Sequence, residues 1–340
     1  MTVYVLGAGA SAHAGYPLAR HLGSALASWV EETTDGHGYR DTIAQLKAYF
    51  TLDNFEAVMT DLVTCRPCLP ASKLPADVRP TLLAAIQKAI RDYFNTIRQQ
   101  TASLYDELAR KHIRKGDLVI TYNYDMAAER SLRSAGLWAI TDGYGFRIGD
   151  STESSAVTIL KLHGSTNWRG LLFRGSTTGF RKAHDSLGSR PVLYFRSDLD
   201  YLGYGEFNDP DCAHLRTAGT ISAMVMPALP KRFYHETSSF GREWEPFWDD
   251  LWQRAEAALQ KADKLVIIGY RLPDADERAR ELLLRQAAKN INLTICCGDA
   301  TASIERQFRE QGFSRIGHAP DPTFEGWLAS NESKLGYEPR

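Results

Sequence analysis

A glycine-rich turn lies near the start of the sequence, directly after a short apolar run. Val3 to Leu6 is apolar, Gly7-Ala8-Gly9-Ala10-Ser11 follows, and Gly15 and Pro17 come just beyond. Between a strand and a helix, such glycines let the backbone turn tightly and approach a pyrophosphate, whose charge then faces the helix N-terminus. We therefore expect this turn to bind a dinucleotide such as NAD. The alternative is a glycine turn needed only for tight packing of strand and helix.

An amide and a carboxylate follow the next strand-like run. Asn123 and Asp125 lie two residues apart, directly after Leu118 to Thr121. Because they alternate with Tyr122 and Tyr124 at the carboxyl end of a predicted strand, both should point toward a ligand there. They could orient a ribose or a water molecule. Asp125 could equally cap the helix that is predicted to begin near Met126.

His163 ends the third run, in Lys161-Leu162-His163-Gly164. Histidine is the side chain best suited to accept a proton near neutral pH, and the glycine after it would let a substrate approach closely. A lone histidine is more often structural. This one shares a predicted sheet edge with two other polar clusters, which favours a general base.

Glycine and acidic residues also follow the last two strand-like runs. Gly269 and Tyr270 precede Asp274 and Asp276, and Gly298 precedes Asp299. Glycine at a strand end indicates close backbone approach to a nucleotide, and Asp274, Asp276 or Asp299 could accept hydrogen bonds from ribose hydroxyls. Ordinary turn chemistry explains Pro273-Asp274 equally well.

The elements that must position these groups form an α/β pattern. Short apolar runs predict strands near Val3 to Leu6, 118–121, 157–160, 265–268 and 291–297, and helices are predicted over 17–30, 244–262 and 277–289. Such runs suit parallel strands covered on both faces. We therefore expect one domain over residues 1–340, with a Rossmann-like doubly wound parallel sheet, a helical insertion at about 38–115 and an irregular loop insertion at about 170–220.

Composition narrows the class of protein further. The formal net charge is -1, so the sequence lacks the basic field of non-specific nucleic-acid binding, and we predict no direct contact with nucleic acid. The adjacent Cys296 and Cys297 lie in an apolar run, which indicates reduced thiols. Neither a leader segment nor a run of about 18 apolar residues is evident, so a cytoplasmic protein without membrane contact is expected.

Taken in order, these motifs resemble the sirtuin-like family of NAD-consuming proteins. The resemblance lies in GAGAS with AGYP behind it, TYNYD, KLHGSTNW and IGYRLPDAD, and it covers roughly residues 3–300. Asn167-Trp168, Met226-Pro227-Ala228-Leu229-Pro230-Lys231 and the Gly269 to Asp276 motif look more like the bacterial branch, which includes NAD hydrolases acting in phage defence.

The cysteines depart from the deacylase pattern. Deacylase sirtuins hold a structural zinc with two Cys pairs beyond the catalytic histidine, whereas only Cys212, Cys296 and Cys297 follow His163 here. Cys65-x-x-Cys68 is a single pair in a Pro-rich loop. The resemblance therefore implies no metal, and it disfavours a zinc-dependent deacylase.

The resemblance assigns roles where residues match. Gly7, Ala8, Gly9 and Ser11 would hold the pyrophosphate and ribose, Asn123 and Asp125 the nicotinamide ribose or the attacking water, and Gly269, Tyr270 and Asp299 the adenosine half. His163 would be the general base. The implied reaction is hydrolysis of NAD+, as substrate, to nicotinamide and ADP-ribose, restrained by homo-oligomerisation or by a defence partner such as an ATPase or an Argonaute-type protein.

Other classes remain open. A non-catalytic sensor of NAD or ADP-ribose would need the glycine turn but neither Asn123 nor His163. A deacylase without zinc would consume NAD only with an acylated peptide, and a dehydrogenase ranks last because the acidic ribose reader expected about 20 residues beyond the glycine turn is absent. The stripe Trp244, Trp248 and Trp252 could form an interface, although core packing is favoured.

Overall fold

Six parallel strands form the central sheet of the computed structural model. The structure describes residues 1–64, 75, 78–97, 103–146, 154–171, 193–195, 220–224 and 245–332. The strands lie in the order β3-β2-β1-β7-β8-β9. Their bounds are β1 Thr2–Leu6, β2 Leu118–Thr121, β3 Thr158–Lys161, β7 Lys264–Ile268, β8 Asn292–Cys296 and β9 Ile316–Gly317. The predicted α/β, Rossmann-like class is confirmed, and five of these strands agree with the apolar runs to within two residues.

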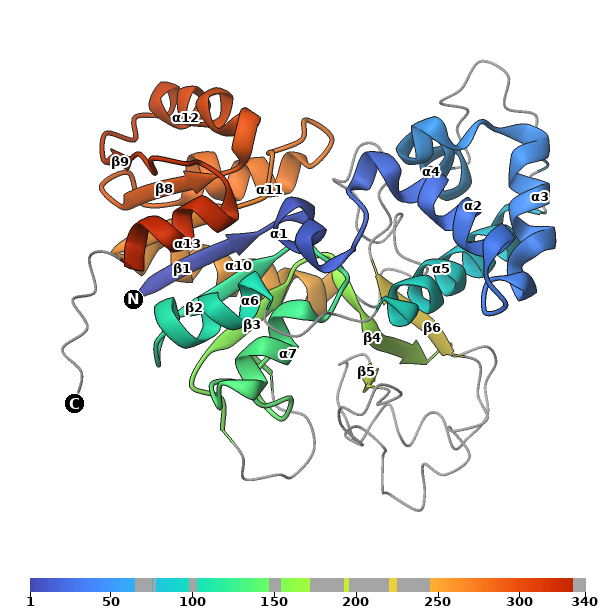
Figure 1. Ribbon diagram of the computed structural model, residues 1–340, viewed down its shortest axis with the longest axis horizontal. Coiled ribbons are helices and arrows are strands. Elements are labelled where there is room, and N and C mark those ends of the chain that lie inside the picture. The colour runs from blue at the N-terminus through green and yellow to red at the C-terminus, as the bar shows by residue number, and fades with distance from the viewer. Residues whose placement is uncertain are drawn as a thin grey trace.

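Helices cover both faces of this sheet (Figure 1). On one face α6 contacts both α7 and α13, and on the other α10 contacts the helical turn that continues α11. The bounds are α6 Leu104–Glu107, α7 Ala127–Ser134, α10 Glu245–Lys261, α11 Glu277–Glu281 with its continuation Leu282–Gln286, α12 Thr301–Glu310 beside β8, and α13 Phe324–Glu332. Because both faces are covered, consecutive residues such as Val3, Tyr4 and Val5 are all buried.

Two tryptophans of the expected stripe belong to the core. Trp248 and Trp252 of α10 are both buried, and Trp248 packs at 6.3 Å, centroid to centroid, from Trp168. The packing interpretation therefore holds for these two residues, whereas Trp244 lies outside the described part of the chain.

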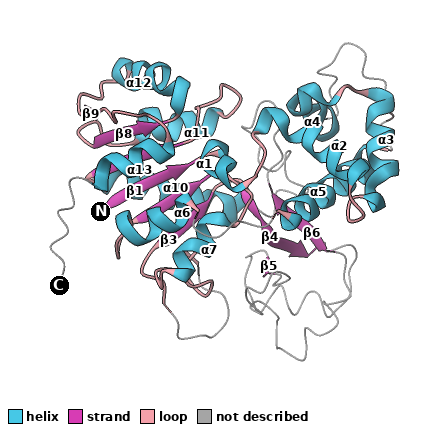
Figure 2. Cartoon of the chain, in the orientation of Figure 1, coloured by secondary structure: helices cyan, strands magenta, loops and turns pink. Residues whose placement is uncertain are grey.

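A separate lobe of four helices stands beside the sheet (Figure 2). It consists of α2 Leu22–Glu32, α3 Arg40–Tyr49, α4 Phe55–Thr64 and α5 Arg79–Thr96. Residues 104–112, within the expected insertion, instead pack with the sheet layer, where the Tyr4 hydroxyl donates to the His112 carbonyl at 3.1 Å.

The first long helix begins later than the sequence predicts. The helix expected over 17–30 starts at Leu22, after a 3₁₀ turn at Ala19–His21, because Leu18 is extended at φ -66° and ψ 153°. The glycine turn itself forms a short helix, α1 Ala8–Ser11, and a 3₁₀ turn, Ala12–Ala14, follows it. Among the residues that the structure describes, none of the helices combines the length and hydrophobicity that crossing a bilayer requires.

A small antiparallel sheet lies between the sheet domain and the lobe (Figure 1). Its strands are β4 Gly164–Leu171, β5 Leu193–Phe195 and β6 Thr220–Met224, in the order β5-β4-β6. Helix α5 of the lobe contacts β4 and β6. Most of the loop insertion expected at 170–220 lies outside the described residues, as does Met226 to Lys231.

Candidate functional site

The strand order places four polar segments at one edge of the sheet. The chain begins at β1 and proceeds through β2 to β3 on one side, and β7 to β9 extend on the other. The order in which the chain adds strands thus changes direction between β1 and β7, and open α/β sheets bind ligands at such a point. The last paired residues are level, since Leu6 pairs with both Thr121 and Ile268, and Thr121 pairs with Lys161. Four groups lie beyond these strand ends, and we call them together the strand-end site. They are the Gly7 to Ser11 turn, Asn123, His163 and Asp276.

The glycine turn packs directly on the backbone that follows β7. The Gly7 amide donates to the Ile268 carbonyl at 3.0 Å, and the Gly9 amide donates to the Gly269 carbonyl at 3.0 Å. A Cβ on Gly7 would lie 2.6 Å from the Gly269 oxygen. Close packing of the two backbone segments therefore requires a residue without a side chain at Gly7. The turn still presents Gly9, which is exposed, and Ala8, which is half-buried, while Ala10 is buried.

The Gly269→Ala variant is expected to unfold at a markedly lower urea concentration than the matched variant Gly136→Ala. Gly269 has a φ of +63°, and a Cβ there would lie 2.1 Å from the Ala10 nitrogen. Gly136 has a similar φ of +70° but open space around its Cβ position. Gly136→Ala should cost about 1–2 kcal/mol for its conformation alone, and Gly269→Ala about 1–3 kcal/mol more for the overlap. Equal unfolding midpoints would contradict the backbone contact.

Asn123 ties the end of β2 to the glycine turn. Its Nδ2 donates to the Gly7 carbonyl at 2.9 Å and to the Ser11 hydroxyl at 3.0 Å. Because a carbonyl only accepts, the amide nitrogen must face inward, and Oδ1 is the atom that can orient a water or a hydroxyl. Asn123 is 8% exposed, so only a small part of this residue is open to solvent.

Ser11 helps to hold the Asn123 side chain in place. Its side chain is buried, and its hydroxyl lies 2.9 Å from the Tyr105 hydroxyl as well as accepting from Asn123. Burial raises the pKa of Tyr105 well above its ordinary value, so this phenol remains protonated. The structure therefore commits the Ser11 hydroxyl to holding Asn123. Gly15 ends the following 3₁₀ turn at a φ of +89°, and Pro17 comes after it.

Asp125 lies one residue before Met126, the N-cap residue of α7, and its side chain bonds the backbone at the start of that helix. Its Oδ1 accepts from the Ala127 amide at the start of α7, at 3.0 Å. Its backbone carbonyl accepts from the Lys161 ammonium. Asp125 thus shapes the segment that carries Asn123, and its carboxylate is buried beside the site.

The sequence did not single out a buried ion pair behind this segment. Lys161 and Glu129 are 0% and 2% exposed, and Lys161 Nζ lies 2.7 Å from Glu129 Oε1. Tyr144 donates to the same oxygen at 3.2 Å, and Asn167 donates to the Tyr144 hydroxyl at 3.1 Å. A lysine at the end of an otherwise apolar run was the available signal, because such a residue needs a buried partner.

His163 meets an aspartate from the other half of the sheet. Its Nε2 lies 3.2 Å from Asp276 Oδ2, with side-chain exposures of 4% and 1%. The Tyr270 hydroxyl donates to the same Oδ2 at 2.8 Å. Tyr122 stacks on Tyr270 with ring centroids 4.2 Å apart and lies 5.0 Å from the His163 ring. Burial, followed by the charge of Asp276, raises the pKa of Tyr122 well above its ordinary value.

The other acidic candidates lie apart from His163. The Asp274 side chain is 99% exposed and is 3.4 Å from Arg280, and the Asp299 side chain is 80% exposed and bonds Arg271 at 2.6 Å. Both are therefore rim positions, to which solvent has access. Gly298, before Asp299, adopts a φ of +59°.

The described cysteines are buried thiols. Cys296 and Cys297 are free, and burial raises the pKa of Cys297 to about 11, so it stays protonated near neutral pH. Cys65, Cys68 and Cys212 lie outside the described residues. Within the described ranges, no three His, Cys, Asp or Glu side chains gather in a metal-binding cluster.

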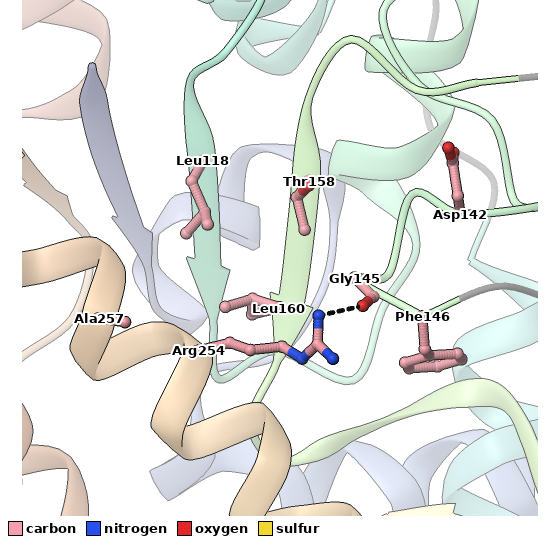
Figure 3. A pocket seen from close by; sticks show the side chains of 8 residues that line it. All are labelled: Leu118, Asp142, Gly145, Phe146, Thr158, Leu160, Arg254 and Ala257. Atoms are coloured by element: carbon pink, nitrogen blue, oxygen red, sulfur yellow. Dashed lines mark hydrogen bonds between the residues drawn. The ribbon is translucent and has the colours of Figure 1, made fainter. Parts of the chain in front are cut away.

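A surface pocket of about 450 Å³ lies on the α10 side of the sheet (Figure 3). Leu118 and Thr158 begin two strands at its wall, and Arg254 crosses it to donate to the Gly145 carbonyl at 2.7 Å. None of the residues lining it belongs to the strand-end site.

The strand-end site combines a glycine turn, an anchored amide and a buried histidine paired with an acid. Its residues come from four strand ends that are distant in sequence and level in the sheet. Function is inferred from these residues and their contacts, since comparison of the sequence with protein-family models and with curated proteins found no match.

Proposed function

We propose that this protein is an NAD+ glycohydrolase, which cleaves NAD+ to nicotinamide and ADP-ribose at the strand-end site. The observation that carries the proposal is the attachment of Asn123 to the glycine turn, with Nδ2 at 2.9 Å from the Gly7 carbonyl. Asn123 follows β2, and His163 follows the neighbouring strand β3. This arrangement supports a dinucleotide lying across the β1–β7 switch point with its nicotinamide ribose toward β2 and β3.

The reaction needs few protein groups. As the ribose C1′–N bond breaks, its electron pair neutralises the pyridinium nitrogen and nicotinamide leaves, while positive charge develops on an oxocarbenium-like ribose. A water oxygen bonds to C1′ and gives a proton to His163, acting as general base. Asn123 Oδ1 would hold that water or a ribose hydroxyl in place. General-base and positioning effects of this kind each contribute about 10²–10⁴-fold in rate.

The exposed part of the glycine turn suits the pyrophosphate. Gly9 and Ala8 are accessible at the carboxyl end of β1, whereas the Ser11 hydroxyl is engaged within the protein. We assign backbone approach at Ala8 and Gly9 to the pyrophosphate, and the exposed residues Asp274 and Asp299 to the adenosine side. Tyr270, whose hydroxyl bonds Asp276 next to His163, belongs with the histidine instead. Ser11 instead holds Asn123.

A sensor that binds NAD or ADP-ribose without turnover is the second candidate. The observation favouring it is that the Asn123 amide hydrogens, the Ser11 hydroxyl and the Asp125 carboxylate all bond within the protein. Because these groups are already held by bonds within the protein, the site could bind NAD or ADP-ribose without rearranging. The two functions differ in whether nicotinamide is released.

An unrestrained enzyme of this kind would exhaust the cellular pool of NAD. We therefore also propose that the activity is held off until a signal, as in an effector of bacterial antiphage defence, through self-assembly or through a partner such as an ATPase or an Argonaute-type protein. A rate of nicotinamide release per mole of protein that changes with protein concentration would support self-assembly, and a constant rate per mole would favour a separate partner.

The test is chromatography of NAD+ incubated with the purified protein, scoring nicotinamide and ADP-ribose, with His163→Gln protein as background. Release by the wild type alone supports the glycohydrolase. Release only with an added acylated peptide would replace it with a deacylase. Binding of NAD+ by calorimetry without release, at low and at high protein concentration alike, would contradict an enzyme that is active by itself and would favour the sensor.

A further inference from the structure

The backbone around Asp276 directs its carboxylate away from the usual role of an aspartate at a helix start. Asp276 is the N-cap residue of α11, yet its side chain makes no capping hydrogen bond. Its amide donates to the Pro273 carbonyl at 3.0 Å, and its carbonyl accepts from the Arg280 amide at 3.0 Å. These bonds fix the main chain, and the carboxylate turns inward to His163 instead of toward the first turn of its own helix.

The preceding segment is held in an unusual conformation. Leu272 has a φ of +52°, which costs a side-chain-bearing residue about 1–2 kcal/mol. Its carbonyl accepts from Arg280 at 2.7 Å, and the side chain is buried. Such conformations persist where the surroundings over-determine them, and they cluster at functional sites. Here the turn brings Tyr270 and Asp276 onto the same side, next to His163.

Burial sets the proton positions in this group. A carboxylate with 1% exposure requires donors. The Tyr270 hydroxyl donates to Oδ2 at 2.8 Å, and His163 Nε2 lies 3.2 Å from the same oxygen, at ion-pair distance without the alignment of a formed hydrogen bond. The phenol can supply one proton. The imidazole can supply the second only if its hydrogen is on Nε2, which leaves the lone pair on Nδ1.

We propose that Asp276 is the positioning residue of His163. It holds the neutral imidazole in the Nε2–H tautomer, so that Nδ1 is the atom that takes the proton from the attacking water and Asp276 stabilises the imidazolium that results. This proposal rests on the proposed NAD+ hydrolysis. It adds an acid that sequence reasoning did not separate from Asp274.

The tautomer can be read without any turnover. Long-range ¹H–¹⁵N correlation spectra at a pH where His163 is neutral distinguish Nε2–H from Nδ1–H, with the signal assigned by its loss in His163→Gln. The Nε2–H pattern is expected in the wild type. Asp276→Asn should shift the population toward Nδ1–H, because an amide accepts more weakly and can donate. Asp249→Asn, which removes an exposed carboxylate bonded to Arg278 at 2.7 Å, should leave the pattern unchanged.

The kinetic arm measures what the pairing contributes. Asp276→Asn should lower kcat by about 10²-fold or more, as expected when a catalytic histidine adopts the wrong tautomer, with KM changed less than about threefold. Tyr270→Phe keeps the ring stack on Tyr122 and removes one donor to Oδ2, so a smaller loss in kcat is expected. Thermal melting of each variant checks that the fold is retained.

The outcomes separate the two proposals. An Nε2–H signal that Asp276→Asn alters, in a protein that releases no nicotinamide, would overturn the hydrolase and retain the pairing. A wild-type Nδ1–H signal, or kcat and tautomer both unchanged in folded Asp276→Asn, would overturn the positioning role and leave the hydrolase standing.

Discussion

Asn123→Ala is expected to lower the turnover number for NAD+ cleavage by about 10²–10⁴-fold, the range over which a single positioned polar group acts on a transition state. The substitution removes Oδ1, the acceptor that we assign to the water or ribose hydroxyl. It also removes both donors to the glycine turn, the bonds to the Gly7 carbonyl at 2.9 Å and the Ser11 hydroxyl at 3.0 Å. Chromatographic assay of nicotinamide release under saturating NAD+ measures the loss.

A second variant separates the chemical role of Asn123 from its structural one. Tyr105→Phe removes the hydroxyl that lies 2.9 Å from the Ser11 hydroxyl, and so weakens the same cluster while Asn123 keeps Oδ1. We expect it to lower the free energy of unfolding by about 1 kcal/mol and kcat by less than tenfold. If Asn123→Ala kept its kcat within about threefold, or if both variants lost activity in proportion to stability, Asn123 would have no direct part in cleavage.

The outline of this site followed from the sequence because parallel strands place their carboxyl ends at one edge. Leu118 to Thr121 and Val157 to Leu160 are apolar enough to be recognised as strands, so Asn123 and His163 could be expected together. The missing acidic reader also has an explanation. The strand beside β1 begins only at Leu118, after the helical lobe, and its end carries Asn123 instead of an acid.

The choice between Asp274 and Asp276 could not be made from the sequence. The two residues share a turn and a charge, and they differ because Leu272 adopts a positive φ that buries one carboxylate and exposes the other. That conformation depends on Arg280 bonding the Leu272 carbonyl, which is a tertiary contact. β9 escaped notice for a simpler reason, since two residues, Ile316 and Gly317, contain no periodicity.

The buried ion pair behind the site could not be predicted from the sequence either. Lys161 ends an apolar run, but its partner Glu129 is on α7 and becomes a neighbour only when that helix packs against the sheet. The Lys161 ammonium also bonds the Asp125 carbonyl, so the pair connects α7 and β3 to the segment that carries Asn123. The buried Lys161–Glu129 ion pair thus helps to hold the reactive groups in place.

Lys161→Met is accordingly expected to lower the free energy of unfolding by about 3–5 kcal/mol, measured by urea denaturation, because it leaves Glu129 charged and buried without its cation. The lysine and glutamate are 0% and 2% exposed, so solvent cannot replace the lost partner. Lys47→Met is the matched control. Its ion pair with Glu31 has exposures of 45% and 60%, and its loss should cost less than about 1 kcal/mol.

The double variant Lys161→Met, Glu129→Leu decides whether the large loss comes from the orphaned charge. Removing both charges should recover at least half of the lost stability, because an apolar pair of similar volume has no desolvation cost. Nicotinamide release should not recover in parallel, since the Asp125 carbonyl would still lack the ammonium that holds the segment after β2. Recovery of stability together with full activity would show that the ion pair stabilises the fold alone. Failure to recover stability would instead assign the loss to packing around the Lys161 side chain.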